Sequence, residues 1–300
     1  MIRLPSRIII SFFLIALGWQ ATTSAEEAED PNFNLQLTAL TNKVRDYNLR
    51  VKAMNELVVL DSNRAFPVLA SILKDSTDNQ PIRYLAAQKL VQINHTLAIN
   101  SLQKILDNQK EDTFARRTAM AQLIAASESD MRHRILDILN DPTEDPAMRQ
   151  YALGIFSQWE DPRKVAKLRN FVVSKTETLS MRTNALFTLE SIKDLDFVSH
   201  SIHQFLNDKN EDEDLRKNCV IIAQRINDDG SVPIMAIIAK DKHEPSSLRQ
   251  LAIMTLARVG NGAVLEDLEA IFKQEFDETI SRELKDTISS IKQREKNRNT

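Results

Sequence analysis

Histidine is the residue in this chain best suited to metal chemistry, and three of the five histidines stand where they could act. His200 and His203 lie one helical turn apart, a spacing that allows two imidazoles to chelate one ion, and His243 is followed directly by Glu244. A closed metal site needs about four ligands. Because each pair supplies only two, we interpret His200 and His203 as solvated helix side chains and expect no metal at His243. The sequence predicts no metal and no cofactor, with a metal-dependent protein as the alternative.

Arginine could bind anions, and it recurs every 33 or 34 residues. The column consists of Arg50, Arg83, Arg116, Arg149, Arg182, Arg216, Arg249 and Arg282. Five positions before each later arginine stands an acid: Asp78, Glu111, Glu144, Glu177, Glu211, Glu244 or Asp277. Capping residues often follow these acids, and both features stabilise helix N-termini. We therefore interpret the two columns as a structural ladder of ion pairs between repeats rather than as a set of anion sites.

Other catalytic arrangements are missing from the sequence. Five glycines are too few for a glycine-rich phosphate loop, and no Ser-His-Asp or Cys-His arrangement stands out from spacing. Cys219, the single cysteine, occupies a position that alanine takes in most other repeats, so it is expected to pack as a small apolar residue. We expect no enzymatic activity.

Apolar columns keep the same period as the arginines and define two helices per repeat. Small residues stand three positions after the arginine: Ala53, Ala86, Ala119, Ala152, Ala185, Cys219 and Ala252. Together with offsets of minus one, seven and ten they form one stripe of a first helix. Offsets of sixteen, nineteen and twenty-three form the stripe of a second helix. Short polar turns join the two into an antiparallel hairpin, and hairpins of this kind bury their apolar faces by stacking.

These units resemble HEAT repeats of the phycobilisome-lyase-like type. Ile82-Arg83 with Ala86 and Leu90 matches the first half of that pattern, and Asp161-Pro162 begins a match to the second half. The resemblance covers residues 33 to 292 and implies an all-α fold, a right-handed α-solenoid of seven hairpins with half-repeats at both ends. Such repeats mostly imply a binding surface and only occasionally an enzyme. HEAT-like hydroxylases carry several His-Glu pairs, whereas this chain has one.

A cationic strip is the best candidate for a binding site. Eighteen positions after three successive arginines stand Arg134, Lys167 and His200. By the resemblance, the second helices line the concave face of the solenoid. Other basic side chains are expected nearby: Lys104, His133, Arg163 and His203. On a chain of net charge −3 this strip suits an extended acidic segment of a partner protein, and the overall charge argues against nucleic acid. A solvated polar face is the alternative.

The N-terminus has the form of a secretory signal peptide over residues 1–25. Arg3 and Arg7 precede an apolar run, and Thr23-Ser24-Ala25 offers a cleavage point. The run is shorter than the ~20 residues that span a bilayer. We expect a periplasmic or secreted protein without a transmembrane span in the mature chain; the alternative is an uncleaved anchor in the inner membrane.

The predicted organisation after the signal peptide has three parts. An acidic linker covers 26–32, the repeats cover 33–293, and a charged tail covers 294–300. The sequence as a whole indicates an exported, non-enzymatic scaffold that binds a protein on the concave face. The alternative is a HEAT-like enzyme or metal-dependent accessory factor, of the lyase or hydroxylase kind.

Overall fold

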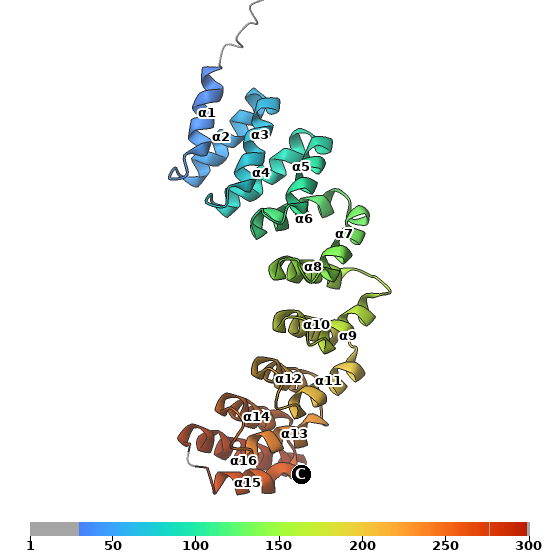
Figure 1. The fold of residues 1–300 in the computed structure, drawn as a ribbon. Helices are drawn as coiled ribbons and strands as arrows, with labels where there is room; N and C mark the ends of the chain where they lie inside the picture. The colour runs from blue at the N-terminus through green and yellow to red at the C-terminus, as the bar shows by residue number, and fades with distance from the viewer. Residues whose placement is uncertain (1–29, 276, 299–300) are drawn as a thin grey trace, which may run out of the picture. The chain divides into compact units, whose positions relative to one another are not determined.

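The computed structural model describes residues 30–275 and 277–298, and in that part of the chain every regular element is helical (Figure 1). The predicted signal peptide and most of the predicted linker lie outside the described residues. By internal packing the chain divides into two units, one ending at Ser101 and one beginning at Leu102. Each unit is described by itself.

Unit 1 contains a half-repeat followed by helical hairpins. Its elements are α1 (Pro31–Thr41), α2 (Tyr47–Leu60), α3 (Ser62–Lys74), α4 (Gln80–Ile93) and α5 (His95–Asp107), which runs across the unit boundary. The half-repeat α1 packs on α2, and α3 packs on α4. Asp30 caps α1 by accepting a hydrogen bond from the Asn32 amide, and Pro31 occupies the first helical position, where a missing N–H costs nothing.

Unit 2 continues the same arrangement. Its helices are α6 (Thr113–Ala126), α7 (Glu128–Asn140), α8 (Pro146–Gln158), α9 (Lys164–Val173), α10 (Leu179–Ser191), α11 (Leu195–Asn207), α12 (Glu213–Ile226), α13 (Ser231–Lys240), α14 (Ser246–Val259), α15 (Leu265–Phe272) and α16 (Glu278–Arg298). A short 3-10 turn, η1 (Gly262–Val264), precedes α15. First helices such as α8, α10, α12 and α14 form one layer, and second helices α9, α11 and α13 form the other (Figure 1).

The described chain is an all-α solenoid, as predicted. The seven predicted hairpins and the two terminal half-repeats are all present. The last helix differs from the expectation at its end, because α16 continues to Arg298 rather than stopping at 293. The Arg294 side chain explains part of this extension: its guanidinium donates to the carbonyls of Ala257, Arg258 and Gly260 at the end of α14.

Capping side chains set where the helices begin. Asp112 and Asp212 each accept two backbone N–H bonds at the start of α6 and α12, and Asp145 and Thr178 accept one each at α8 and α10. These bonds satisfy amides that have no partner inside the helix. Asn79, which stands at the same position before α4, makes no such side-chain bond.

The core lies between the stacked hairpins, and its pattern differs in part from the predicted stripe. The small-residue column is buried throughout, Cys219 included. The column four positions after each arginine is also buried: Met54, Ala87, Met120, Leu153, Leu186, Val220 and Ile253. Sequence analysis missed this column because a stacked first helix is covered on both flanks. The predicted column at offset ten is buried only in part, since Trp159 lies in the core while Leu60 and Ile192 at the helix ends remain partly exposed.

Candidate functional site

The arginine column forms a set of buried three-way junctions. In one of them, Arg116 donates from Nε to the carbonyl of Leu106 (2.9 Å) and from both terminal nitrogens to the carboxylate of Glu144 (2.6 Å each). The carbonyl belongs to the end of α5 and the carboxylate to the loop before α8, so one guanidinium joins three successive repeats. A bidentate pair of this kind is the strongest form of arginine–carboxylate bond.

The same junction recurs with small variations. Arg50 joins the Leu40 carbonyl to Asp78 in unit 1. In unit 2 the further pairs are Arg149–Glu177, Arg182–Glu211, Arg216–Glu244 and Arg249–Glu275. Arg83 is buried and donates to the Leu73 carbonyl.

Two members of the column depart from the prediction. Arg249 pairs with Glu275 rather than with Asp277, because the carboxylate of Asp277 accepts the amides of Thr279 and Ile280 at the start of α16. Arg282 is exposed, since it stands on α16, the last helix that the structure describes, and no hairpin covers it there. The prediction that Arg282 belongs to the structural ladder was therefore wrong.

Electrostatics within the junctions favour the charged forms. The hydrogen bonds from Arg116 hold the pKa of Glu144 below its usual value, and those from Arg182 do the same for Glu211, in each case against the opposing effect of burial. The Glu144 carboxylate in turn raises the pKa of Arg116. The buried charges are thus matched inside the fold, which leaves these guanidinium groups committed to the protein rather than to a ligand.

Glu244 belongs to this ladder, so its carboxylate is not available to bind a metal ion together with His243. Both oxygens of Glu244 accept hydrogen bonds from Arg216, at 2.6 and 2.8 Å, and the side chain is buried. A metal ion at His243 would have to displace Arg216. Within residues 30–275 and 277–298, no group of three or more His, Cys, Asp or Glu side chains could hold a metal ion.

Of the two helical histidines, only His200 has the solvated position expected for both, and the expectation was wrong for His203. His200 is exposed, whereas the His203 ring lies 2.6 Å from an Asp228 oxygen and packs against Gly230. Asp228 also accepts from the hydroxyls of Ser199 and Ser231. Burial raises the pKa of Asp228, but these three hydrogen bonds outweigh it, and the pKa lies below its usual value. His203 therefore fastens α11 to the start of α13.

Three cationic side chains of the predicted strip are bonded to other side chains of the protein. Arg134 pairs with Asp107 at the end of α5, and Lys167 bonds the Asn140 amide oxygen at the end of α7. Arg163 pairs with the neighbouring Asp161. The pKa of Lys167 is lowered by burial. Lys104 and His133 are exposed on the same helices. Sequence analysis placed these residues on one face but did not foresee partners 27 positions earlier.

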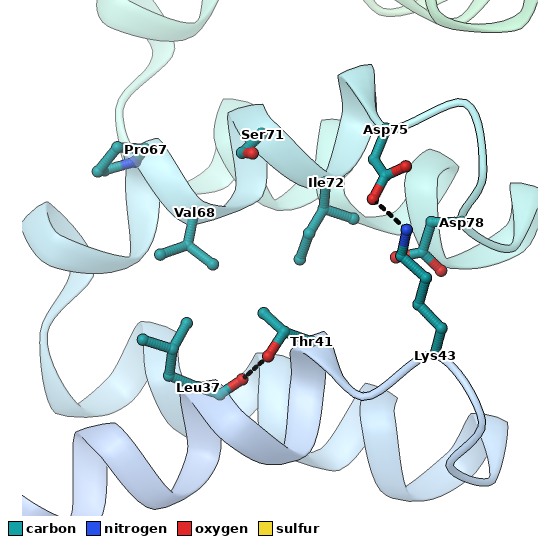
Figure 2. Close-up of a pocket in the computed structure, with 9 residues that line it drawn as sticks. All are labelled: Leu37, Thr41, Lys43, Pro67, Val68, Ser71, Ile72, Asp75 and Asp78. Carbon is teal, nitrogen blue, oxygen red and sulfur yellow. Dashed lines mark hydrogen bonds and ion pairs between the residues drawn. The ribbon is translucent and has the colours of Figure 1, made fainter.

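Hollows between successive second helices were not predicted. In unit 1 a hollow of about 410 Å³ lies between α1 and α3, with Leu37, Val68 and Ile72 as apolar walls (Figure 2). The ion pair between Lys43 and Asp75, at 2.5 Å, closes one end. The hydrogen bonds from Lys43 and Thr77 lower the pKa of Asp75 to about 2.

A second hollow of about 440 Å³ lies between α13 and α15 in unit 2. Its apolar lining includes Val232, Ala236, Ile237 and Val264, and Lys240 and Asp267 stand at its rim. Ile237 is 62% exposed although it is a large apolar side chain. Both hollows are lined by the proline that stands at the same place in its repeat, Pro67 or Pro233. That shared proline was the sequence signal that could have located them.

Comparison with known proteins supports the architecture. No family model and no curated sequence matches the chain. Among solved structures, Kap95p from a complex with RanGDP matches 86% of this chain and 45% of its own, with a TM-score of 0.50 and 11% identity. The fold is that of the HEAT repeats.

Two further similar structures have lower TM-scores. Escherichia coli YibA matches at 17% identity and TM-score 0.44, over 85% of this chain and 91% of its own. Human deoxyhypusine hydroxylase matches at 15% identity and TM-score 0.38, over 87% and 96%. At these identities the similarity describes the fold and says nothing about chemistry. In the described residues, no helix has the length and apolar character needed to cross a membrane.

Proposed function

We propose that this protein is an exported, non-enzymatic scaffold that binds another protein through the exposed surface of its second helices, which we call the second-helix face. The observation that carries the proposal is the hollow between α13 and α15, where Ile237 stands exposed beside an apolar cleft. Large apolar side chains beside a cleft are typical of protein-binding surfaces. The hollow between α1 and α3 is of the same kind.

The chemistry of this face favours a partner segment with apolar side chains. The hollow between α13 and α15 accepts an apolar side chain, and Lys240 at its rim is exposed but pairs with Asp267, while Asp229 also lines the hollow. On α11, the adjoining second helix, His200 is exposed as well. Rim charges act mainly on the rate of encounter and on specificity, and salt screens them. We therefore expect binding that depends chiefly on Ile237 and moderately on ionic strength.

The absence of catalysis and the export of the chain belong to the same proposal. The charged groups best placed for chemistry are engaged within the fold: Glu244 with Arg216, and His203 with Asp228. Export rests on the signal-like residues 1–25. N-terminal sequencing of protein recovered from native cells should give a chain that begins at Glu26, in the periplasmic or secreted fraction. A full-length chain retained in the cytosol would overturn this part.

The experiment that tests the binding role is site-specific photo-crosslinking in native cells. A benzophenone side chain at Ile237 or at Val68 should give the same discrete crosslinked protein. The matched control is Val59, an 85% exposed apolar residue on first helix α2, where no such product is expected. Equal products from all three positions, or none from Ile237, would contradict the proposal. Metal analysis of the purified protein addresses the enzyme alternative, because stoichiometric iron or zinc would favour it.

A further inference from the structure

Gly154 lies within helix α8 at a place where the fold gives glycine no structural task. Its backbone φ is not positive, so no left-handed conformation requires it. A Cβ built there meets no atom within 4 Å, so no close packing requires it either. Glycine inside a helix is destabilising relative to alanine. In the next three repeats the same place holds a larger side chain: Phe187, Ile221 and Met254.

The missing side chain opens a hollow on the first helices. The hollow has a volume of about 600 Å³ and lies over α6 and α8 of unit 2. Besides Gly154, its lining consists of Arg117, Ala147, Gln150, Tyr151, Ile155 and Gln158. Ala147, Gly154 and Ile155 supply apolar surface, and the remaining side chains supply hydrogen-bond donors. This hollow lies on first helices, so it is separate from the second-helix face on which the proposed function rests.

The charge of this hollow has one sign. The Arg117 guanidinium lies 4.5 Å from the centre of the Tyr151 ring and is exposed. Neither α6 nor α8 contains an aspartate or glutamate, although the chain has 42 acidic residues. A guanidinium stacked on an aromatic ring keeps its N–H edge available, and that edge matches a carboxylate. The Gln158 amide can bond a peptide backbone, and so can the amide oxygen of Gln150, whose nitrogen donates to the Ser180 hydroxyl.

We propose that this hollow binds an extended segment of a partner protein, which places a large apolar side chain against Gly154 and a carboxylate beside Arg117. The inference goes beyond the second-helix face and does not depend on it. Glycine is the residue that leaves room for the apolar side chain, and the acid-free surface of α6 and α8 selects the negative neighbour. Gly154→Phe restores the side chain found at Phe187 and should close the hollow from within.

Phage-displayed random heptapeptides provide the probe. Selection on the full chain, with counter-selection on Gly154→Phe, should enrich peptides that carry Asp or Glu next to a large apolar residue. A synthetic enriched peptide should bind at least tenfold more weakly to Gly154→Phe and to Arg117→Glu. Met254→Phe, at the same place in a repeat without this hollow, should bind it like the wild type. Ile237→Glu should also bind it normally, which separates this site from the second-helix face.

Stability measurements keep the test independent of folding. Gly154→Phe and the milder Gly154→Ala should melt at or above the wild-type temperature, because each removes a helical glycine from an open position. Arg117→Gln serves as a second variant, which should weaken binding without altering the melting temperature. Selection that yields no peptides, or peptides lacking acids, would overturn the proposal. So would unchanged affinity in a folded Gly154→Phe or Arg117→Glu variant.

Discussion

Arg116 and Glu144 stand 28 residues apart in the sequence and are joined by two parallel hydrogen bonds of 2.6 Å inside the protein. The same guanidinium also holds the terminal carbonyl region of α5 through Leu106. The Arg116 side chain thereby donates to the Leu106 carbonyl at the end of one hairpin and neutralises the Glu144 carboxylate in a later loop. This relationship, repeated along the column, fixes the spacing of the hairpins.

Removing Arg116 should destabilise the protein strongly. Arg116→Ala leaves the Glu144 carboxylate buried without its partner, and breaking a buried pair in this way costs on the order of 3–5 kcal/mol. Urea unfolding followed by circular dichroism measures the loss. Arg163→Ala is the control, because that arginine is exposed and its replacement should cost much less than that of the buried Arg116. Equal stabilities of the two variants would show that the column is not structural.

The Arg149–Glu177 ion pair should contribute less to the unfolding free energy than the Arg116–Glu144 pair. Arg149 makes one bond of 2.8 Å to Glu177, and Arg149 Nε and Glu177 Oε2 have no hydrogen-bond partner. Since part of the pair is already unsatisfied, Arg149→Ala should cost less, about 1–3 kcal/mol. The same urea experiment ranks the two variants. A larger loss for Arg149→Ala would contradict the geometry.

At acidic pH, Glu144 should lose its contribution to the unfolding free energy. Its pKa in the folded chain lies below the ordinary 4.5, so its stabilising effect is complete above that pH and is lost as the pH falls through the lowered pKa. Wild type should exceed Glu144→Gln in unfolding free energy at pH 7, and the gap should narrow below pH 4.5. Glu213→Gln, on a half-buried glutamate at the surface that pairs with Lys217, should show a much smaller gap. A difference between wild type and Glu144→Gln that is constant from pH 7 to pH 3 would refute the assignment.

The Cys219 thiol should be inert in the folded protein. Burial, with a smaller effect of Glu211, raises its pKa to about 12, so almost no thiolate exists at pH 8. A chromogenic disulfide reagent should react slowly until urea unfolds the chain. Ile221→Cys in a Cys219→Ala background places a thiol on the same helix at an exposed position and should react at once. Rapid reaction of native Cys219 would show that α12 opens readily.

The repeat made most of the fold predictable from the sequence. A period that recurs in several columns leaves few alternatives to stacked hairpins, so the helices and the Arg–acid columns follow from spacing alone. The ends were less predictable. Leu49, one position before Arg50, is exposed because the half-repeat α1 supplies no first helix beside it, and Arg282 is exposed because it stands on the last helix that the structure describes. Glu275 replaces Asp277 at Arg249 because the same carboxylate cannot cap α16 and serve the ladder.

The surface was less predictable than the core. The shared column predicts that Arg134 and Lys167 lie on one face, but it does not reveal that Arg134 pairs with Asp107 and that Lys167 donates to the Asn140 amide oxygen on the preceding second helices. A hollow can depend on a missing side chain, as at Gly154, and a search of the sequence for residues with reactive groups does not find it.

Affinity for the protein crosslinked at Ile237 tests the central claim most directly. Calorimetric titration of that partner should give at least tenfold weaker binding to Ile237→Glu than to wild type, because a charge would enter the apolar hollow. Val59→Glu should bind like wild type, and both variants should unfold at the wild-type urea concentration, since both positions are exposed. Unchanged affinity in a folded Ile237→Glu variant would contradict the assignment of binding to the second-helix face.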